Sequence, residues 1–135
     1  MALIYWMPDY NTGIEVIDQQ HHILVDLINE LYQAQENGAG NKELLKILGK
    51  VGMYATSHFA REENLFEVHN YPEAEEHIQE HNYFEDMLFQ FEDECKAGRQ
   101  NLTENAISFL SDWLVNHLNG TDKEYVPYLK SRGVS

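Results

Sequence analysis

Cysteine and basic residues are both scarce in this sequence. Cys95 is the only cysteine among 135 residues, so no disulfide can form within the chain, and a reducing compartment is compatible with it. Lys and Arg number 9 against 23 Asp and Glu, which gives a formal net charge of −14 with His counted neutral. So few cations argue against a nucleic-acid partner, whose phosphates are bound by Lys and Arg, and against an anionic membrane surface.

Long apolar runs, strand-like alternation and internal repeats are absent as well. The N-terminal stretch MALIYWMPDY has neither a basic start nor a long apolar run, so we expect no signal peptide, no membrane insertion and a cytoplasmic protein. Hydrophobic residues make up 43% of the chain, an ordinary share for a globular domain with a sizeable core. We therefore expect one domain over residues 1–135.

Apolar residues recur at helical spacing in four successive segments, which predicts helices over about residues 17–36, 42–69, 73–97 and 103–120. Helix-breaking residues fill the gaps: Asn37-Gly38-Ala39-Gly40, Asn70-Tyr71-Pro72 and Gly98. Asn41 is predicted to cap the second helix.

Four helices with short loops and one apolar stripe each predict an all-α fold. The expected architecture is an antiparallel up-down four-helix bundle over residues 17–131, including a short C-terminal segment after Gly120. Residues 1–16 are expected to form an ordered N-terminal arm whose aromatic side chains lie against the bundle.

The apolar stripes also carry imidazoles and a carboxylate. Five of the seven histidines and one glutamate occupy core-facing positions: His21, His58, Glu62, His77, His81 and His117. His58 and Glu62 are four residues apart, as are His77 and His81, so each pair projects from one face of a helix. The break at Asn70-Tyr71-Pro72 should fold the two helices into a hairpin in which the pairs face each other.

The adjacent His21 and His22 are predicted to have different environments. His21 falls on the stripe that contains Ile17 and Leu24, whereas His22 lies on a mostly polar face. His69, at the end of its helix, is also expected at the surface.

One histidine on an apolar stripe is more often an ordinary buried residue than a ligand. Five imidazoles and a carboxylate buried without partners would cost a few kcal/mol each, together more than the ~5–15 kcal/mol of net stability of a domain. Metal ions would satisfy them. Asp122, shortly after the fourth helix, adds a second carboxylate.

Seven ligands are too many for one tetrahedral zinc, so two ions that share bridging carboxylates fit better. Imidazole with carboxylate suits iron, zinc, copper or nickel. The absence of thiolates from the set excludes iron–sulfur clusters.

This combination of motifs resembles the hemerythrins, and specifically the single-domain bacteriohemerythrins. The resemblance covers essentially the whole chain and rests on Ile17-Asp18-Gln19-Gln20-His21 with Leu24, His58-Phe59 with Glu62-Glu63, His77 with Glu80-His81, and Trp113-Leu114-Val115-Asn116-His117 with Asp122. It implies two iron ions (Fe2+/Fe3+) per chain with an oxo or hydroxo bridge and no heme. By resemblance, one iron would be held by His77, His81 and His117, the other by His21 and His58, and both would be bridged by Glu62 and Asp122.

The resemblance also implies a site for dioxygen. The iron with two histidines would keep an open coordination position. Five apolar residues match the positions that line the family's oxygen pocket: Leu24, Phe59, Trp113, Leu114 and Leu118. They would keep water and protons away from bound oxygen, although the same residues would serve as ordinary core.

Reversible dioxygen binding is the implied function, for oxygen transport, storage or delivery to an oxygen-consuming protein. The protein is then no enzyme, and weak oxidase or peroxidase side activity stays compatible with it. Two alternatives stay open: an oxygen or redox sensor that acts through a separate partner, and a di-iron oxidase or peroxidase-type enzyme. No Glu-x-x-His motif occurs among the core-facing ligands, which favours an oxygen carrier over a ferritin-like oxidase.

Overall fold

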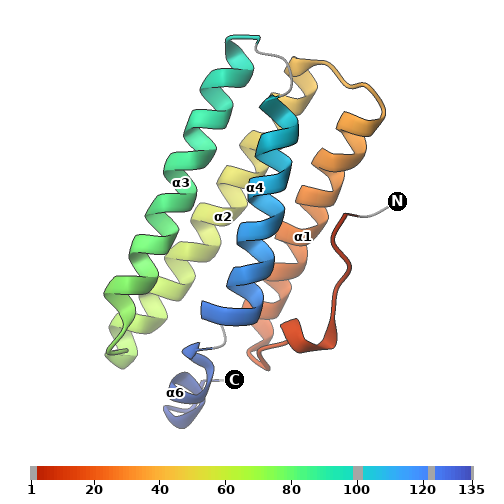
Figure 1. Cartoon of the computed structure of the whole chain (residues 1–135). Helices are drawn as coiled ribbons and strands as arrows, with labels where there is room; N and C mark the ends of the chain where they lie inside the picture. The colour runs from red at the N-terminus through yellow and green to blue at the C-terminus, as the bar shows by residue number, and fades with distance from the viewer. Residues whose placement is uncertain (1–2, 99–101, 122–123, 135) are drawn as a thin grey trace.

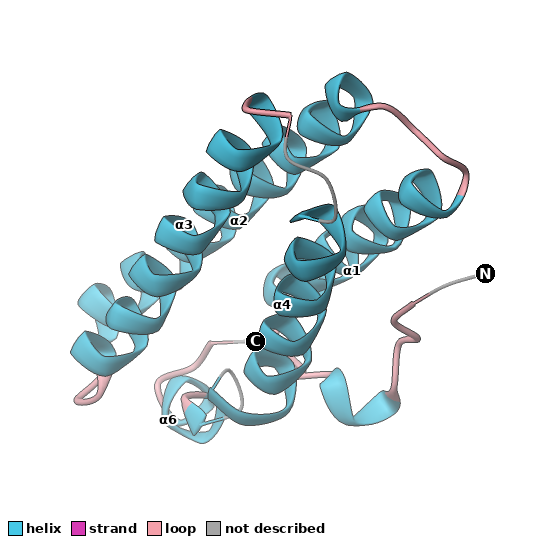
Figure 2. Cartoon of the chain, turned by 45° about the horizontal axis from the view of Figure 1, so that its top comes forward, coloured by secondary structure: helices cyan, strands magenta, loops and turns pink. Residues whose placement is uncertain are grey.

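The structure is a computed structural model that describes residues 3–98, 102–121 and 124–134. Four long helices run up and down the long axis of the molecule (Figure 1): α1 (Glu15–Glu36), α2 (Asn41–His69), α3 (Ala74–Lys96) and α4 (Leu102–Asn116). The described ranges contain no strand (Figure 2). This confirms the predicted all-α four-helix bundle.

Three short elements flank the bundle. The arm contains a 3-10 turn, η1 (Pro8–Tyr10), and α4 continues into a π-helical turn, η2 (His117–Thr121). The last helix, α6 (Val126–Ser131), lies beyond the end of the bundle, below α4 in Figure 1. Among the helices described, none is both long and apolar enough to pass through a membrane.

The core has two parts. α2 packs against α1 and α3, and α4 completes the bundle by contacting α1 and α3, so a main core runs between the four helices. A second cluster joins the start of α1 and the end of α2 to the C-terminal segment, and it consists of Ile14, Ile17, Phe66, Tyr71, Tyr125 and Leu129.

α1 begins at Glu15, two residues before the predicted start, because Asp18 organises the turn that precedes it. The Asp18 carboxylate accepts hydrogen bonds from the Thr12 amide at 2.8 Å, the Thr12 hydroxyl at 2.7 Å and the Gly13 amide at 3.1 Å. Gly13 has φ of 82°, a left-handed conformation that favours glycine. These contacts fix the helix phase just ahead of His21.

The predicted capping role of Asn41 is wrong. Gly40 is the N-cap of α2, and Asn41 is already helical. The Asn41 side-chain amide donates to the carbonyl of Cys95 at 3.4 Å, and Cys95 Sγ donates to the Asn41 carbonyl at 3.5 Å. Asn41 therefore ties the start of α2 to the end of α3, a tertiary contact that a local sequence pattern does not reveal.

The turn between α2 and α3 sets how these helices face each other. Asn70 ends α2 in the left-handed conformation with φ of 54°, which Asn tolerates better than most residues. The Tyr71 amide then donates to the Phe66 carbonyl at 2.9 Å. This tight reversal brings the last turns of α2 alongside the first turns of α3.

The N-terminal arm is held by α1. The Asn29 side chain accepts hydrogen bonds from the amides of Leu3 and Ile4 at 3.0 and 2.8 Å, and it donates to the Ile4 carbonyl at 2.9 Å. Tyr10 is buried, but Tyr5 is 65% exposed. The expectation that the arm's aromatic side chains lie against the bundle is therefore correct for Tyr10 and wrong for Tyr5.

Candidate metal centre

Six of the seven residues predicted as metal ligands converge inside the bundle. His21 comes from α1, His58 and Glu62 from α2, His77 and His81 from α3, and His117 from the start of η2. None of the six is more than 4% exposed. The seventh, Asp122, lies outside the described residues.

The six residues form two groups that share one member. In each group, the possible ligand atoms all lie within 4.8 Å of one another: Glu62, His77, His81 and His117 in the first, and His21, His58 and Glu62 in the second. Since Glu62 belongs to both, the arrangement can hold two cations on either side of one carboxylate.

Imidazoles surround the Glu62 carboxylate. Its Oε1 lies 3.1 Å from Nε2 of His58 and 3.1 Å from Nε2 of His81, and its Oε2 lies 3.6 Å from Nε2 of His77. Complete burial acts to raise the pKa of Glu62, but it is outweighed by the charge of His58 and by side-chain contacts with His117, His58 and His77, which hold that pKa well below its usual range. The carboxylate is therefore ionised and can bind cations.

These contacts are close without being well-formed hydrogen bonds. Within the described chain, neither Glu62 oxygen has a hydrogen-bond partner of good geometry, and the same holds for Nε2 of His81. Buried polar atoms are nearly always paired, because leaving them unpaired costs free energy. A cation between these atoms would satisfy them, and imidazole with carboxylate is a donor set that suits iron or zinc. The residues therefore fit a non-heme metal site.

Two side chains outside the predicted ligand set orient the imidazoles. Nδ1 of His58 lies 2.7 Å from Oε1 of Gln20, and Nδ1 of His81 lies 3.1 Å from Oε2 of Glu63. Each oxygen accepts a hydrogen bond from Nδ1–H, so Nε2 keeps the lone pair that a metal needs. In the second group of possible ligands, Nε2 of His21 and Nε2 of His58 lie 3.0 Å apart.

Aromatic rings cover the site on the side of the predicted oxygen pocket. Phe59 stacks on His81 with ring centroids 3.9 Å apart, and Trp113 stacks on His117 at 4.4 Å. Leu24, Leu114 and Leu118 are buried in the same main core. A surface hollow of about 260 Å³ reaches both Trp113 and His117.

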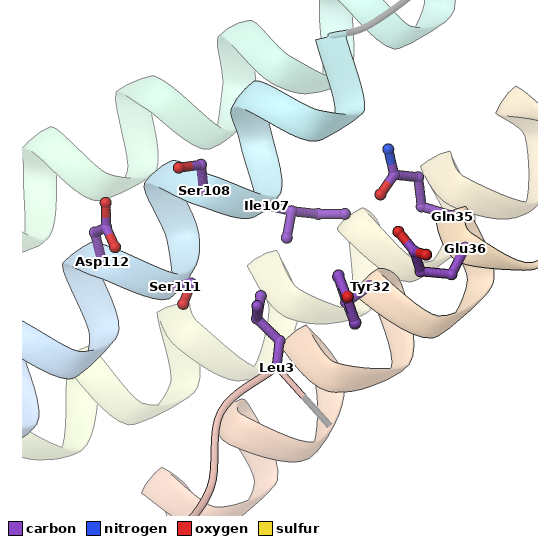
Figure 3. A pocket seen from close by; sticks show the side chains of 8 residues that line it. All are labelled: Leu3, Tyr32, Gln35, Glu36, Ile107, Ser108, Ser111 and Asp112. Carbon is purple, nitrogen blue, oxygen red and sulfur yellow. The ribbon is translucent and has the colours of Figure 1, made fainter. Parts of the chain in front are cut away.

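A second hollow lies away from these residues. A groove of about 310 Å³ lies between α1 and α4 beside Leu3 of the arm (Figure 3), and it is lined by Leu3, Tyr32, Gln35, Glu36, Ile107, Ser108, Ser111 and Asp112. Its lining includes no histidine and none of the six converging residues. It is therefore separate from the candidate metal centre.

Comparison with known proteins agrees with this geometry. The family model described as "Hemerythrin HHE cation binding domain" matches residues 12–129. The chain belongs to the hemerythrin family. It is 34% identical to the bacteriohemerythrin of Stenotrophomonas maltophilia over 131 residues, covering 97% of this chain and 84% of that protein. It is 35% identical to the bacteriohemerythrin of Pseudomonas aeruginosa over 126 residues, covering 93% and 81%.

Solved structures extend the match to three dimensions. A crystal structure of wild-type hemerythrin superposes with a TM-score of 0.87 at 29% sequence identity, covering 95% of this chain and 98% of that one. The bundle of this hemerythrin is thus the family fold over nearly its whole length.

Three residues around the site of this hemerythrin were not assigned a role from the sequence. Gln20 and Glu63 directly adjoin His21 and Glu62 in the motifs, and that adjacency was the available signal. Tyr125 is fully buried with its ring 5.5 Å from that of His77, but it follows an aperiodic stretch that gave no signal. By contrast, His22 is exposed as predicted and stacks on Trp6 of the arm at 3.6 Å.

Proposed function

We propose that this hemerythrin binds dioxygen reversibly at a centre of two iron ions. The observation that carries the proposal is the position of Glu62, a buried carboxylate shared by two separate groups of imidazoles. One shared ligand between two such groups suits a pair of ions better than one, because a single tetrahedral ion would leave imidazoles without a partner. Oxygen transport, storage or delivery to an oxygen-consuming protein is the role that follows.

The proposed ligands divide unequally between the two ions. His77, His81 and His117 would bind one iron, His21 and His58 the other, and Glu62 would bridge them. Asp122 is proposed as the second bridge on the strength of its sequence motif alone. When bound, the iron pair supplies the electrons that dioxygen takes up on binding and returns on release. With only His21 and His58 as nitrogen ligands, the second ion would keep a coordination position at which a small ligand can bind.

The protein's own side chains control water and protons around this centre. Phe59 and Trp113 lie flat against the rings of His81 and His117, so they shield two ligands from solvent. Leu24, Leu114 and Leu118 add apolar bulk to the same core, which keeps out water. Gln20 and Glu63 fix the Nδ1 protons of His58 and His81, so these rings keep one orientation whether or not oxygen is bound.

Two measurements on iron-loaded protein test the proposal. Elemental analysis should give two irons per chain, and the visible spectrum should change in air and return under argon over repeated cycles. One zinc per chain with no iron would contradict the two-iron centre. Irreversible oxidation in the first cycle, or rapid multiple turnover of an added reductant in air, would favour an oxidase over a carrier.

A sensor would differ from a carrier in its partners. A pull-down that repeatedly recovers one protein only in the oxygenated state would support signalling through that partner. Recovery of an oxygen-consuming enzyme, with transfer of oxygen to it, would instead support delivery.

A further inference from the structure

Three tyrosines form a row from the candidate metal centre to the surface. The ring centroid of Tyr125 lies 5.5 Å from that of His77 and 6.4 Å from that of Tyr71, and Tyr71 lies 5.4 Å from Tyr128. Exposure increases outward along the row: Tyr125 is 0% and Tyr71 8% exposed, and Tyr128 is half-buried beneath the guanidinium of Arg132. Neighbouring rings at these separations can exchange electrons.

The outer phenols have hydrogen-bond acceptors. The Tyr71 hydroxyl donates to Oε2 of Glu73 at 3.3 Å, and the Tyr128 hydroxyl donates to the carbonyl of Asn70 at 2.9 Å. A phenol is neutral at physiological pH, so removal of one electron is favourable only when its proton can leave as well. Tyr71 therefore has a carboxylate in place to hold that proton.

Packing alone does not require the hydroxyls of this row. Phe66 sits among the same rings, 5.2 Å from Tyr125 and 4.9 Å from Tyr71. Phenylalanine would fill the space of the other rings as well, with loss of the hydrogen bonds that the outer hydroxyls make. A buried hydroxyl carries a desolvation cost that a phenyl ring avoids. What phenylalanine cannot do is give up an electron and a proton at moderate potential.

We propose that Tyr125, Tyr71 and Tyr128 carry oxidising equivalents from the metal centre to the surface when hydrogen peroxide reacts there. The inference rests on the proposed function, because it needs redox-active iron beside His77. Its benefit is protection: the strong oxidant is removed before it damages the ligands.

The electrons and protons balance as follows. Hydrogen peroxide needs two electrons and two protons to become two waters. A centre with both ions ferrous would supply both electrons itself, so the tyrosines act when both ions are already ferric. The row then supplies both electrons and both protons through the Tyr125 phenol, one electron and one proton at a time. Each later step passes one electron and one proton from the outer phenol to the inner one, with Glu73 holding the proton of Tyr71 in transit. A soluble one-electron reductant of the ascorbate class then restores Tyr128 with one electron and one proton.

Trp113 is the competing route. It stacks on His117 and is only partly buried, so an oxidant could reach the surface through a single indole. The tyrosine row differs in having a carboxylate acceptor at its middle member. The two routes end on different side chains, Trp113 and Tyr128, and this makes them separable.

The test detects the tyrosyl radical directly and does not rely on a measurement of catalytic activity. Iron-loaded protein with both ions ferric is mixed with an excess of hydrogen peroxide and frozen for electron paramagnetic resonance, while a parallel sample with a nitroso spin trap is digested for mass spectrometry. We expect a tyrosyl signal and a trap adduct on Tyr128. Tyr125→Phe and Tyr71→Phe, which keep the ring, should each lower that adduct severalfold. Tyr5→Phe, in the exposed part of the arm, should leave it unchanged.

An adduct mainly on Trp113, or an undiminished adduct on Tyr128 in both phenylalanine variants, would overturn the inference. Two variants are used so that a folding failure of one leaves the other informative. Iron content and the air and argon spectra are measured on the same preparations. If these fail in the unmodified protein, the proposed function fails. If they succeed and the adduct does not depend on Tyr125 or Tyr71, only the tyrosine route fails.

Discussion

The side chain of Gln20 hydrogen-bonds to the imidazole of His58, with Oε1 of Gln20 2.7 Å from Nδ1 of His58. Nε2 of the next residue, His21, lies 3.0 Å from the other ring nitrogen of His58, Nε2. Two consecutive residues of α1 therefore contact both nitrogens of one imidazole on α2. The rotation of α1 about its axis controls both the tautomer of His58 and the position of its partner ligand.

This relationship makes the effect of Gln20→Leu predictable. Loss of the acceptor should free the His58 ring and lower iron affinity about tenfold or more, as is usual for partners of metal-bound histidines. Competition with a chelator measures the change. Gln19→Leu, at the neighbouring exposed position, is the control. Equal affinities in the two variants would show that Gln20 has no orienting role.

The adjacent histidines should respond oppositely to replacement. His21→Ala should lower iron content or abolish oxygen binding, because it removes half of the imidazole nitrogens proposed for the open iron. His22→Ala should do neither, since His22 is exposed and contacts Trp6. Iron per chain and the oxygenated spectrum report both effects. The reverse result would mean that α1 is rotated by one residue from the structure described.

Leu114→Ala tests the apolar wall. Leu114 is 2% exposed, so truncation should leave a cavity and cost about 2–5 kcal/mol of unfolding free energy. The oxygenated form should still appear because no proposed ligand is changed, but its decay should be faster because water and protons reach it more easily. Stopped-flow spectra separate formation from decay.

Leu48→Ala provides the matched control for that variant. Leu48 is 1% exposed in the same core, and it lies ten residues before His58, about 15 Å along α2. It should lose similar stability without faster decay. Equal decay rates in both leucine variants would mean that Leu114 only fills the core and does not protect the oxygenated form from water and protons.

The pKa of Tyr71 predicts that the folded protein loses stability in alkali. Burial, together with the charge of Glu73, raises the pKa of Tyr71 to about 12, above the value near 10 of an unfolded chain. The folded state therefore holds the phenolic proton more tightly. This contribution is complete below pH about 10 and is lost as the pH rises through about 12, and it amounts to no more than about 3 kcal/mol. Urea unfolding across this range should show the loss in the unmodified protein and not in Tyr71→Phe.

Much of the site was predictable because helical spacing places residues four apart on one face. That rule predicted that His58 and Glu62 share one helix face and that His77 and His81 share another. The break at Asn70-Tyr71-Pro72 predicted that the two pairs face each other. The contacts that refine the site follow from the rotation of one helix against another. The bond from His58 to Gln20 crosses from α2 to α1, so no periodicity within either helix predicts it.

The ends of the elements were less predictable for the same reason. Asn41 resembles a helix cap locally, but its side chain is used by the carbonyl of Cys95 on another helix. The fourth helix was expected to continue to about residue 120, whereas α4 ends at Asn116 and the chain changes to a π-helical turn. Tyr125 is buried by tertiary packing after that turn, where the sequence has no repeating pattern.

That π-helical turn, His117–Thr121, has an evolutionary consequence. A π turn holds one residue more than an α turn, and loss of that residue would shorten the spacing between His117 and Asp122, the proposed second bridge. A deletion inside α4 would instead rotate His117 by about 100° relative to the residues that precede the deletion, and the imidazole would turn away from Glu62. Among relatives that keep the site, we therefore expect changes of length by one residue to be rare throughout positions 105–121.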